Sequence, residues 1–270
     1  MDGFNELMAE VGGILGGILG IEGYEPDAEG VCVLESEEAE IRIIHCPEAD
    51  GMLLITATVM QTPQDGGRTL LAALDANHRF KGTRGATVSL DAESDELVLS
   101  HYLPVDILTP RSFVAMLEAF SSALMSIRAL DAGAMATSPD AAGETDAGGD
   151  AVKTIELDGV TVELSQGAND GLIVAVSDLC EAPDNPGLAQ ELLEANHLFA
   201  GTAGATLSLE AATNRVFLQQ KIYPDDNDED WLPRRLAVFI DKAGEWRRRL
   251  DGSDTPPRDS SPFSEGFLQV

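Results

Sequence analysis

The sequence contains few basic residues for its size, and this limits the partners that it can bind. Only 17 Lys and Arg residues stand against 47 Asp and Glu residues, which gives a formal net charge of -30 at pH 7. Such a chain repels the phosphate backbone of a nucleic acid, and no stripe of Lys and Arg offsets that field. We therefore expect no nucleic-acid partner.

Cysteine is also scarce. The chain has three Cys residues, which is an odd number, and none of them falls in a C-x-x-C pair; they are Cys32, Cys46 and Cys180. Such a set does not make a disulfide framework. We expect buried thiols in a cytoplasmic protein.

The apolar run near the N-terminus is too short to cross a bilayer. It extends from Val11 to Ile21, lies between Glu10 and Glu22, and has 11 residues, whereas a membrane helix needs about 20. The acidic N-terminus also differs from the basic start of a signal peptide. The sequence therefore predicts no integral membrane segment.

What the chain does contain is one module twice. The segment ANHRFKGTRGATVSLD at Ala76–Asp91 recurs as ANHLFAGTAGATLSLE at Ala195–Glu210, with 11 of 16 positions identical at an offset of 119 residues. An offset of this size suggests duplicated domains, because solenoids repeat every 20 to 50 residues or so. A hydrophobic content of 44% is enough for two cores of about 100 to 150 residues each.

The first copy is predicted to occupy residues 1–130. Apolar residues recur at helical spacing from Phe4 to Leu19, and three short strands of an antiparallel meander follow. Gly82 stands where a helix C-terminal glycine belongs, and Pro110 is placed to open the last helix. The expected elements are a helix over 4–19, strands over 31–34, 40–45 and 52–59, a helix over 69–80, strands over 86–90 and 96–103, and a helix from Pro110.

The second copy is predicted at 151–250 and has no counterpart of the first helix. Residues 131–150 lack periodicity and predict a flexible linker, and residues 251–270 predict a disordered tail. The expected strands are 152–157, 160–164, 172–176, 205–209 and 215–222, and the expected helices are 188–199 and 231–250. The predicted fold class is α+β, with two tandem copies of a helix-flanked antiparallel sheet (α-βββ-α-ββ-α).

This order of elements, together with the acidic charge, resembles the Tir-chaperone class of type III secretion chaperones. The resemblance is carried by FNELMAEVGGILG, GVCVLES and LLAALDANHRFKGTRGATVSLD in the first copy, and by residues 152–250 in the second. It implies a cytoplasmic chaperone that binds the non-globular N-terminal region of a secreted effector. Since such proteins usually act as homodimers, two copies in one chain imply an intramolecular pseudo-dimer and a monomeric chain.

The resemblance also implies an apolar groove beside the first helix and the sheet. An extended segment could add backbone hydrogen bonds there and fill side-chain pockets. The same periodicity is what burial in a core requires, so that alternative stays open. The candidate effector-binding residues are Leu7, Val11, Ile14, Ile18, Val31, Val33, Ile41 and Ile43.

The duplicated block also predicts how the copies pack. It has diverged least, and an interface inherited from a homodimer places matching surfaces in contact. We therefore expect pseudo-twofold packing through the helices over 70–80 and 188–199 and the strands that follow them. The predicted inter-repeat residues are Leu70, Leu74, Phe80, Leu192, Leu193 and Phe199.

Catalytic and metal sites are not predicted, and no cofactor is expected. His78 and His197 occupy matching positions but lack the three or four convergent ligands of a metal site. GTRGAT and GTAGAT follow a helix and precede a strand, the reverse of a phosphate loop, and the acidic cluster at 225–230 lacks calcium-loop spacing. Two alternatives to a chaperone remain: a protein that sequesters another secretion component, and an enzyme or small-ligand domain on the same scaffold.

Overall fold

The computed structural model describes residues 7–9, 30–35, 39–46, 52–130, 152–166, 172–224 and 230–252. Three predicted binding residues, Val11, Ile14 and Ile18, lie outside this part of the chain. The predicted linker at 131–150 and residues 253–270 of the predicted tail lie outside it as well.

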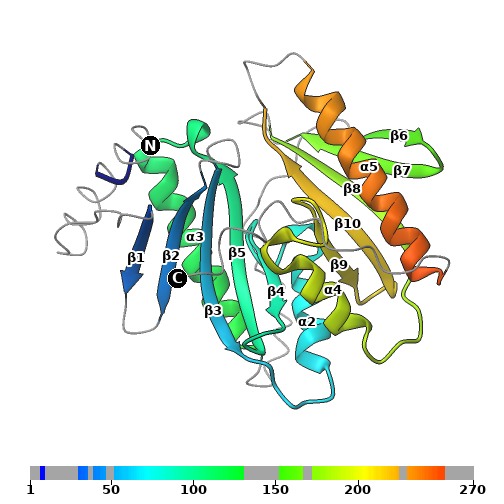
Figure 1. The fold of residues 1–270 in the computed structure, drawn as a ribbon, viewed down its shortest axis with the longest axis horizontal. Helices are drawn as coiled ribbons and strands as arrows, with labels where there is room; N and C mark the ends of the chain where they lie inside the picture. Colours follow the sequence, from blue (N-terminus) through cyan, green and yellow to red (C-terminus); the bar gives the residue numbers. More distant parts are fainter. Residues whose placement is uncertain are drawn as a thin grey trace.

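The first copy forms a five-stranded antiparallel sheet with the strand order β1-β2-β3-β5-β4 (Figure 1). Its strands are β1 (Val31–Glu35), β2 (Glu40–Cys46), β3 (Met52–Gln61), β4 (Thr87–Asp91) and β5 (Glu96–Pro104). Its helices are α2 (Arg68–Asn77), η1 (His78–Phe80), η2 (Val105–Ile107) and α3 (Pro110–Arg128). Residues 7–9 are also helical.

The second copy repeats this arrangement with the strand order β6-β7-β8-β10-β9. Its strands are β6 (Lys153–Leu157), β7 (Val160–Gln166), β8 (Ile173–Glu181), β9 (Thr206–Glu210) and β10 (Arg215–Ile222), and its helices are α4 (Leu188–Asn196), η3 (His197–Phe199) and α5 (Trp231–Leu250). In the described part of this copy β6 comes first, and no counterpart of the helical residues 7–9 precedes it. The predicted α+β order is therefore confirmed.

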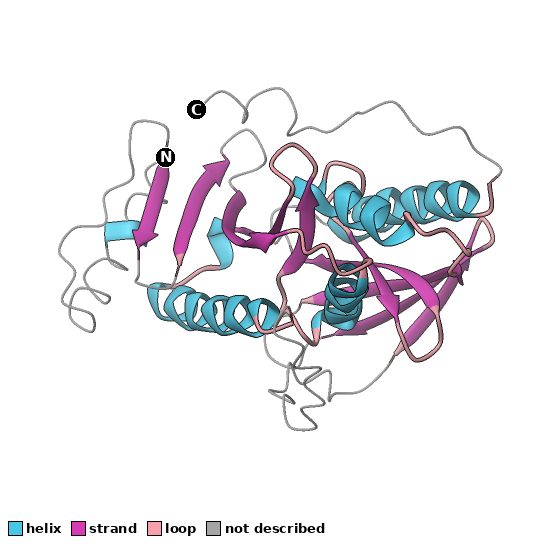
Figure 2. Ribbon diagram, turned by 90° about the horizontal axis from the view of Figure 1, so that it is seen from below, coloured by secondary structure: helices cyan, strands magenta, loops and turns pink. Residues whose placement is uncertain are grey.

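The last helix of each copy covers one face of its own sheet. Helix α3 packs against β3, and α5 packs against β7, β8 and β10. As predicted, Pro110 opens α3, and Thr109 caps it by accepting a hydrogen bond from the Ser112 backbone nitrogen at 3.1 Å. The two helices lie on opposite sides of the molecule in both ribbon views (Figures 1 and 2). The copies thus have the relation that a twofold axis produces.

One hydrophobic cluster runs through both copies. It includes Leu53 and Leu99 from the first sheet and Leu192 and Leu218 from the second copy. Each of these four side chains is fully buried. The two copies therefore share a core.

Equivalent arginines hold a β-bulge in each copy. The pairing of β3 with β5 and that of β8 with β10 both shift register at one extra residue, Val59 in the first copy and Leu179 in the second. Arg128 donates from Nε to the Val59 carbonyl at 2.9 Å, and Arg247 donates to the Leu179 carbonyl at 3.0 Å. Nη2 of each arginine donates to the carbonyl of the preceding strand residue, Thr58 or Asp178. The last helix is thereby tied to the bulge of its own sheet.

The repeated asparagine of the duplicated block explains the link between helix and strand. Asn77 accepts from the Val88 nitrogen at 2.8 Å and donates to the Val88 carbonyl at 2.9 Å. Asn196 makes the same two bonds with Leu207, at 2.7 and 2.9 Å. Both asparagines are fully buried. Each one satisfies a backbone donor and acceptor of the strand that follows its helix.

Gly82 has a different role from the expected helix-ending one. The left-handed backbone that directly follows α2 is at Arg79 and Phe80, with φ of 51° and 56°, and not at Gly82. A Cβ on Gly82 would lie 2.7 Å from the Cβ of Ala76. Glycine is needed there because the turn folds back against the helix, and not because φ is positive.

Candidate functional site

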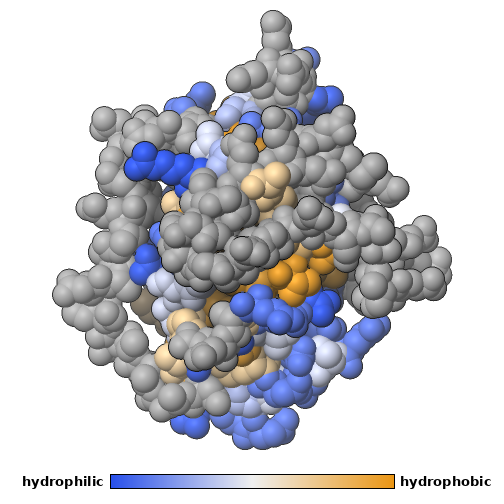
Figure 3. Space-filling view, turned by 90° about the vertical axis from the view of Figure 1, so that its left-hand side faces the viewer, coloured by the Kyte–Doolittle hydropathy of each residue, from blue (hydrophilic) through white to orange (hydrophobic). Residues whose placement is uncertain are grey.

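Strand β1 carries apolar side chains on both faces of the first sheet. Cys32 points into the core and is 3% exposed, whereas Val33 points outward and is 42% exposed. Val31 is half-buried. Figure 3 looks onto this side of the molecule and shows hydrophobic residues among hydrophilic ones. An apolar strand at the edge of a sheet is a suitable binding surface for an extended peptide.

The other described members of the predicted binding set lie inside. Leu7 belongs to the same buried cluster as Ile41 and Ile43, and Met8 beside it is fully buried. Burial is the alternative that the periodicity left open. Of the predicted binding residues in the described part of the chain, Val31 and Val33 are therefore the ones that reach the surface.

Cross-strand pairing shows which residues of the two sheets are equivalent. One row of the first sheet contains Arg42, Thr56 and Ser100, and the matching row of the second contains Glu163, Val176 and Gln219. The next row contains Ile44, Leu54 and Tyr102 in the first sheet, and Ser165, Val174 and Lys221 in the second. The first row continues to Val33 on β1 and to Thr154 on β6.

The outer strand of the second sheet is more polar than β1. Lys153, Thr154 and Glu156 of β6 are all exposed, although Leu157 at its end is exposed as well. Thr154 replaces Val33 at the outward-facing position. The two copies therefore present different surfaces at equivalent places.

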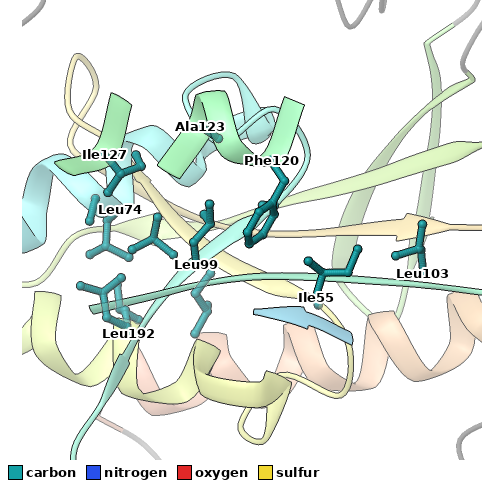
Figure 4. Packing of buried hydrophobic residues seen from close by; sticks show 14 of the residues in the cluster. Ile55, Leu74, Leu99, Leu103, Phe120, Ala123, Ile127 and Leu192 are labelled. Atoms are coloured by element: carbon teal, nitrogen blue, oxygen red, sulfur yellow. The ribbon is translucent and has the colours of Figure 1, made fainter. Parts of the chain in front are cut away.

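The copies meet through α2, α4, β4 and β9 at the centre of the molecule (Figure 1). Helix α2 packs against β9, α4 packs against β4, and the two helices contact each other. In Figure 4, Leu74 and Leu192 lie in one packed group with Leu99. The six residues predicted for this surface are all buried: Leu70, Leu74, Phe80, Leu192, Leu193 and Phe199.

One hydrogen bond marks the pseudo-twofold axis. The hydroxyl groups of Thr87 and Thr206 lie 2.7 Å apart, both residues are buried, and their separation in the sequence is 119 residues. This separation equals the repeat offset, so each threonine contacts its own counterpart. Only a residue next to the axis that relates two copies can do so.

Two histidines lie beside carboxylates of the other copy. His78 Nε2 is 3.5 Å from Glu210 Oε1, and its ring packs against Phe217 at 4.7 Å between centroids. Burial lowers the pKa of His78 below 6.5 despite the opposing effect of Glu210. Burial likewise lowers the pKa of His197, against the opposing charge of Asp91. At neutral pH both rings are therefore uncharged.

Four further polar residues join the copies, and the sequence analysis missed them. The Arg79 nitrogen donates to Gln219 Oε1 at 2.7 Å, and Arg79 Nη2 lies 2.9 Å from Glu163 Oε2. Lys221 donates to the Gly85 carbonyl at 2.8 Å. At Arg79, Gln219 and Lys221 the two copies carry different residues, so an alignment of the repeats that looks for identical positions misses them. The positions at which the aligned repeats differ in charge or polarity are the signal that could have found them.

The described residues contain little that suggests catalysis. No group of three or more His, Cys, Asp and Glu side chains in that part of the chain is placed to hold a metal ion. Burial raises the pKa of the Cys46 thiol to about 11, which keeps it protonated and a poor nucleophile at neutral pH. None of the described helices is both long and apolar enough to span a membrane.

The chain belongs to the Tir chaperone protein (CesT) family, whose profile matches it twice, over residues 14–128 and 145–247. This family comprises type III secretion chaperones, and the two matched regions correspond to the two copies. A comparison with curated protein sequences finds no match.

Several solved structures are similar to the chain. The Yersinia pestis type III secretion chaperone SycH, in complex with a stable fragment of YscM2, is 15% identical and matches over 46% of this chain and 98% of its own, with a TM-score of 0.37. A chain of the HopA1–SchA chaperone–effector complex is 16% identical over 46% of this chain and 94% of its own, at 0.38. A chain of the ExoU–SpcU complex from Pseudomonas aeruginosa is 20% identical over 39% and 87%, at 0.32.

Proposed function

We propose that this chain is a cytoplasmic type III secretion chaperone that binds the non-globular N-terminal segment of a secreted effector and keeps it soluble and competent for secretion. The observation that carries the proposal is the apolar outward side of β1, where Val33 is 42% exposed in a member of a chaperone family. An extended client segment on this strand would remove Val31 and Val33 from water. The net charge of -30 then favours solubility of the complex.

The proposed client groove follows the residues that the sequence analysis selected. Val31 and Val33 contact the client directly, while Leu7, Ile41 and Ile43 form the buried support beneath. Val11, Ile14 and Ile18 complete the set and lie outside the described residues. In this proposal the more polar β6 makes the second copy a weaker client surface.

A charge at Val33 tests the groove without disturbing the core. Val33 is exposed and pairs across the ladder with Arg42, so Val33→Asp places a carboxylate opposite a cation and should change stability by no more than about 0.5 kcal/mol. We expect it to abolish client capture. The control is Thr154→Asp, which puts the same charge at the equivalent exposed position of β6, there opposite Glu163, and its fold is checked by circular dichroism. Capture that survives Val33→Asp, or that is lost equally in both variants, contradicts the proposal.

A charge within the N-terminal apolar stripe gives a second test. Ile14→Asp and Val11→Asp should abolish client binding, since a carboxylate in an apolar site costs several kcal/mol. Circular dichroism on the same variants separates two causes. Loss of binding with the fold intact supports a groove, whereas global unfolding means that the stripe is core.

The client itself identifies which chaperone role applies. Purification of the tagged chain from its native cytoplasm, followed by mass spectrometry, should give one or two dominant partners, and each should carry a secreted, non-globular N-terminal region. A dominant partner that is a regulator and is never secreted would favour sequestration instead. Light scattering during size-exclusion chromatography should show a monomeric chain.

A further inference from the structure

The surface between the copies has two halves that are related by the pseudo-twofold axis but differ in chemistry. In one half the residues of η3 lie on the first sheet, and in the other the residues of η1 lie on the second sheet. Leu198 in η3 is the counterpart of Arg79 in η1, at the repeat offset of 119. The sheets differ in the same sense: the first sheet is apolar where Leu198 packs, and the second sheet is polar where Arg79 packs.

The half formed by η3 is apolar. Phe199 is 5% exposed and shares a buried cluster with Cys46 and Leu54 of the first sheet. Leu198 packs against the same cluster, as does Tyr102, whose ring centroid is 5.7 Å from that of Phe199. Leu198 and Phe199 thus meet the row of the first sheet that contains Ile44, Leu54 and Tyr102.

The half formed by η1 is polar. Arg79 donates its backbone nitrogen to Gln219 and places its guanidinium 2.9 Å from the Glu163 carboxylate. Lys221 takes the place of Tyr102, and its ammonium lies 5.1 Å from the centre of the Phe80 ring. Gln219 also donates to the carbonyl of Asn77. In this half Arg79 and Phe80 therefore contact polar groups of the second sheet.

We infer that this surface is specific for pairing a first repeat with a second repeat and disfavours pairing of like repeats. In a pair of first repeats, Arg79 would lie over the row that contains Arg42 and Ser100, where the second sheet offers Glu163 and Gln219. Two cations would then face each other, and like charges in contact oppose association.

A pair of second repeats fails for the complementary reason. There Leu198 would lie over the row that contains Ser165, Val174 and Lys221, in place of the apolar row of the first sheet. The Glu163 carboxylate would lose the Arg79 cation, and Leu198 would meet Lys221 where the first sheet offers Tyr102. Unlike repeats satisfy both halves at once, so specificity is built from attraction in the right pair and mismatch in the wrong ones.

This specificity has a consequence that does not depend on what the chain binds. Each assembled unit presents one outer strand of the β1 type and one of the β6 type, and never two of the same kind. A homodimer of single-copy chains would present two identical strands. The divergence of the two copies at their shared surface therefore fixes the asymmetry of the whole molecule.

Point variants of the full chain test the two halves. Leu198→Arg puts a cation on the apolar row and should lower the urea midpoint, whereas Leu198→Met, which keeps an apolar side chain of similar volume, should not. Adding Arg42→Glu recreates on the first sheet the pair that Arg79 makes with Glu163, and should restore part of the loss. Arg42→Glu alone should have little effect, because Arg42 pairs at the surface with Glu40. Equal midpoints for Leu198→Arg and the wild type, or no restoration by Arg42→Glu, would overturn the inference.

Re-pairing after cleavage tests the specificity directly. A protease site is introduced between residues 131 and 150 of the full chain. Two preparations of the folded chain that differ in isotope content are each cut at this site. The preparations are mixed, unfolded in urea, refolded together and examined by native mass spectrometry. We expect at least about a tenfold excess of unlike over like pairs. A statistical mixture of the three possible pairs overturns the inference, and if the cut chains fail to refold, the point variants decide.

Discussion

Replacing Leu74 by alanine tests whether the core shared by the two copies also shares their stability. Leu74 lies on α2, is fully buried, and belongs to the cluster that includes Leu192 of the other copy. Removal of a buried leucine side chain costs the lost transfer free energy and leaves a cavity, which together amount to about 2 to 5 kcal/mol. Because packed elements of both copies surround this site, collapse of the cavity is restricted, and we expect a loss of about 3 kcal/mol.

The same helix supplies a matched control. Leu71 lies three residues earlier on α2 but is 45% exposed. Leu71→Ala makes the same chemical change with the same effect on helix propensity, so only burial differs between the variants. We expect Leu71→Ala to change the free energy of unfolding by no more than about 0.5 kcal/mol.

Two optical signals make the assay decisive. Both Trp residues of the chain, Trp231 and Trp246, lie on α5 of the second copy, so their fluorescence reports on that copy alone. Far-ultraviolet circular dichroism reports on both copies. In urea, Leu74→Ala should lower the midpoint of both signals together, by about 1 M for a slope near 3 kcal/mol/M.

Two results would refute this reasoning. If circular dichroism shifts while the tryptophan transition stays in place, the copies unfold independently and the packing between them adds little. If Leu74→Ala and Leu71→Ala have the same effect, burial at this surface does not determine stability.

Three further perturbations address single features of the surface and the fold. Burial is the main cause that holds the pKa values of all four histidines below 6.5, so the unfolded chain binds protons first and the free energy of unfolding should fall as the pH drops from about 7 to about 5. His101→Gln introduces the residue found at equivalent position 220 and should flatten this pH dependence in urea titrations; an unchanged slope would exclude His101 as its source. Thr87→Val leaves the Thr206 hydroxyl buried without its partner and should cost about 1 to 3 kcal/mol in thermal unfolding, while adding Thr206→Val should cost no more. Arg247→Met should lose about 2 kcal/mol because it removes the bonds to the bulge carbonyls, in contrast to a negligible change for the exposed neighbour in Arg248→Met.

The order of elements could be predicted from the sequence because each element is set by spacing along the chain. Alternation in β2 puts Ile41 and Ile43 on one face and Arg42 on the other, and that is what the structure shows. The position of Pro110 predicted the start of α3. The predicted end of the third strand of the second copy was too early, since β8 continues to Glu181 through a bulge that breaks the alternation.

Periodicity could not decide which apolar residues are covered. Val33 on β1 and Ile41 on the neighbouring β2 are both apolar strand residues, yet Val33 is 42% exposed and Ile41 is 8% exposed. The difference arises because Ile41 faces the core cluster, whereas Val33 lies on the opposite face of the sheet. Hydrophobic spacing tells which residues share a face, and it does not tell what lies against that face.

The sequence by itself determined the duplication, the two α+β copies and the surplus of acidic residues, since these follow from composition and from patterns among near neighbours. Tertiary structure alone decided that Thr87 meets Thr206, that Gly82 is needed for its approach to Ala76, and that Arg79 finds Glu163 while Leu198 finds Leu54. The physical reason is that such contacts join residues far apart in the chain or set by a tight turn, and their partners are chosen by how whole elements pack in space.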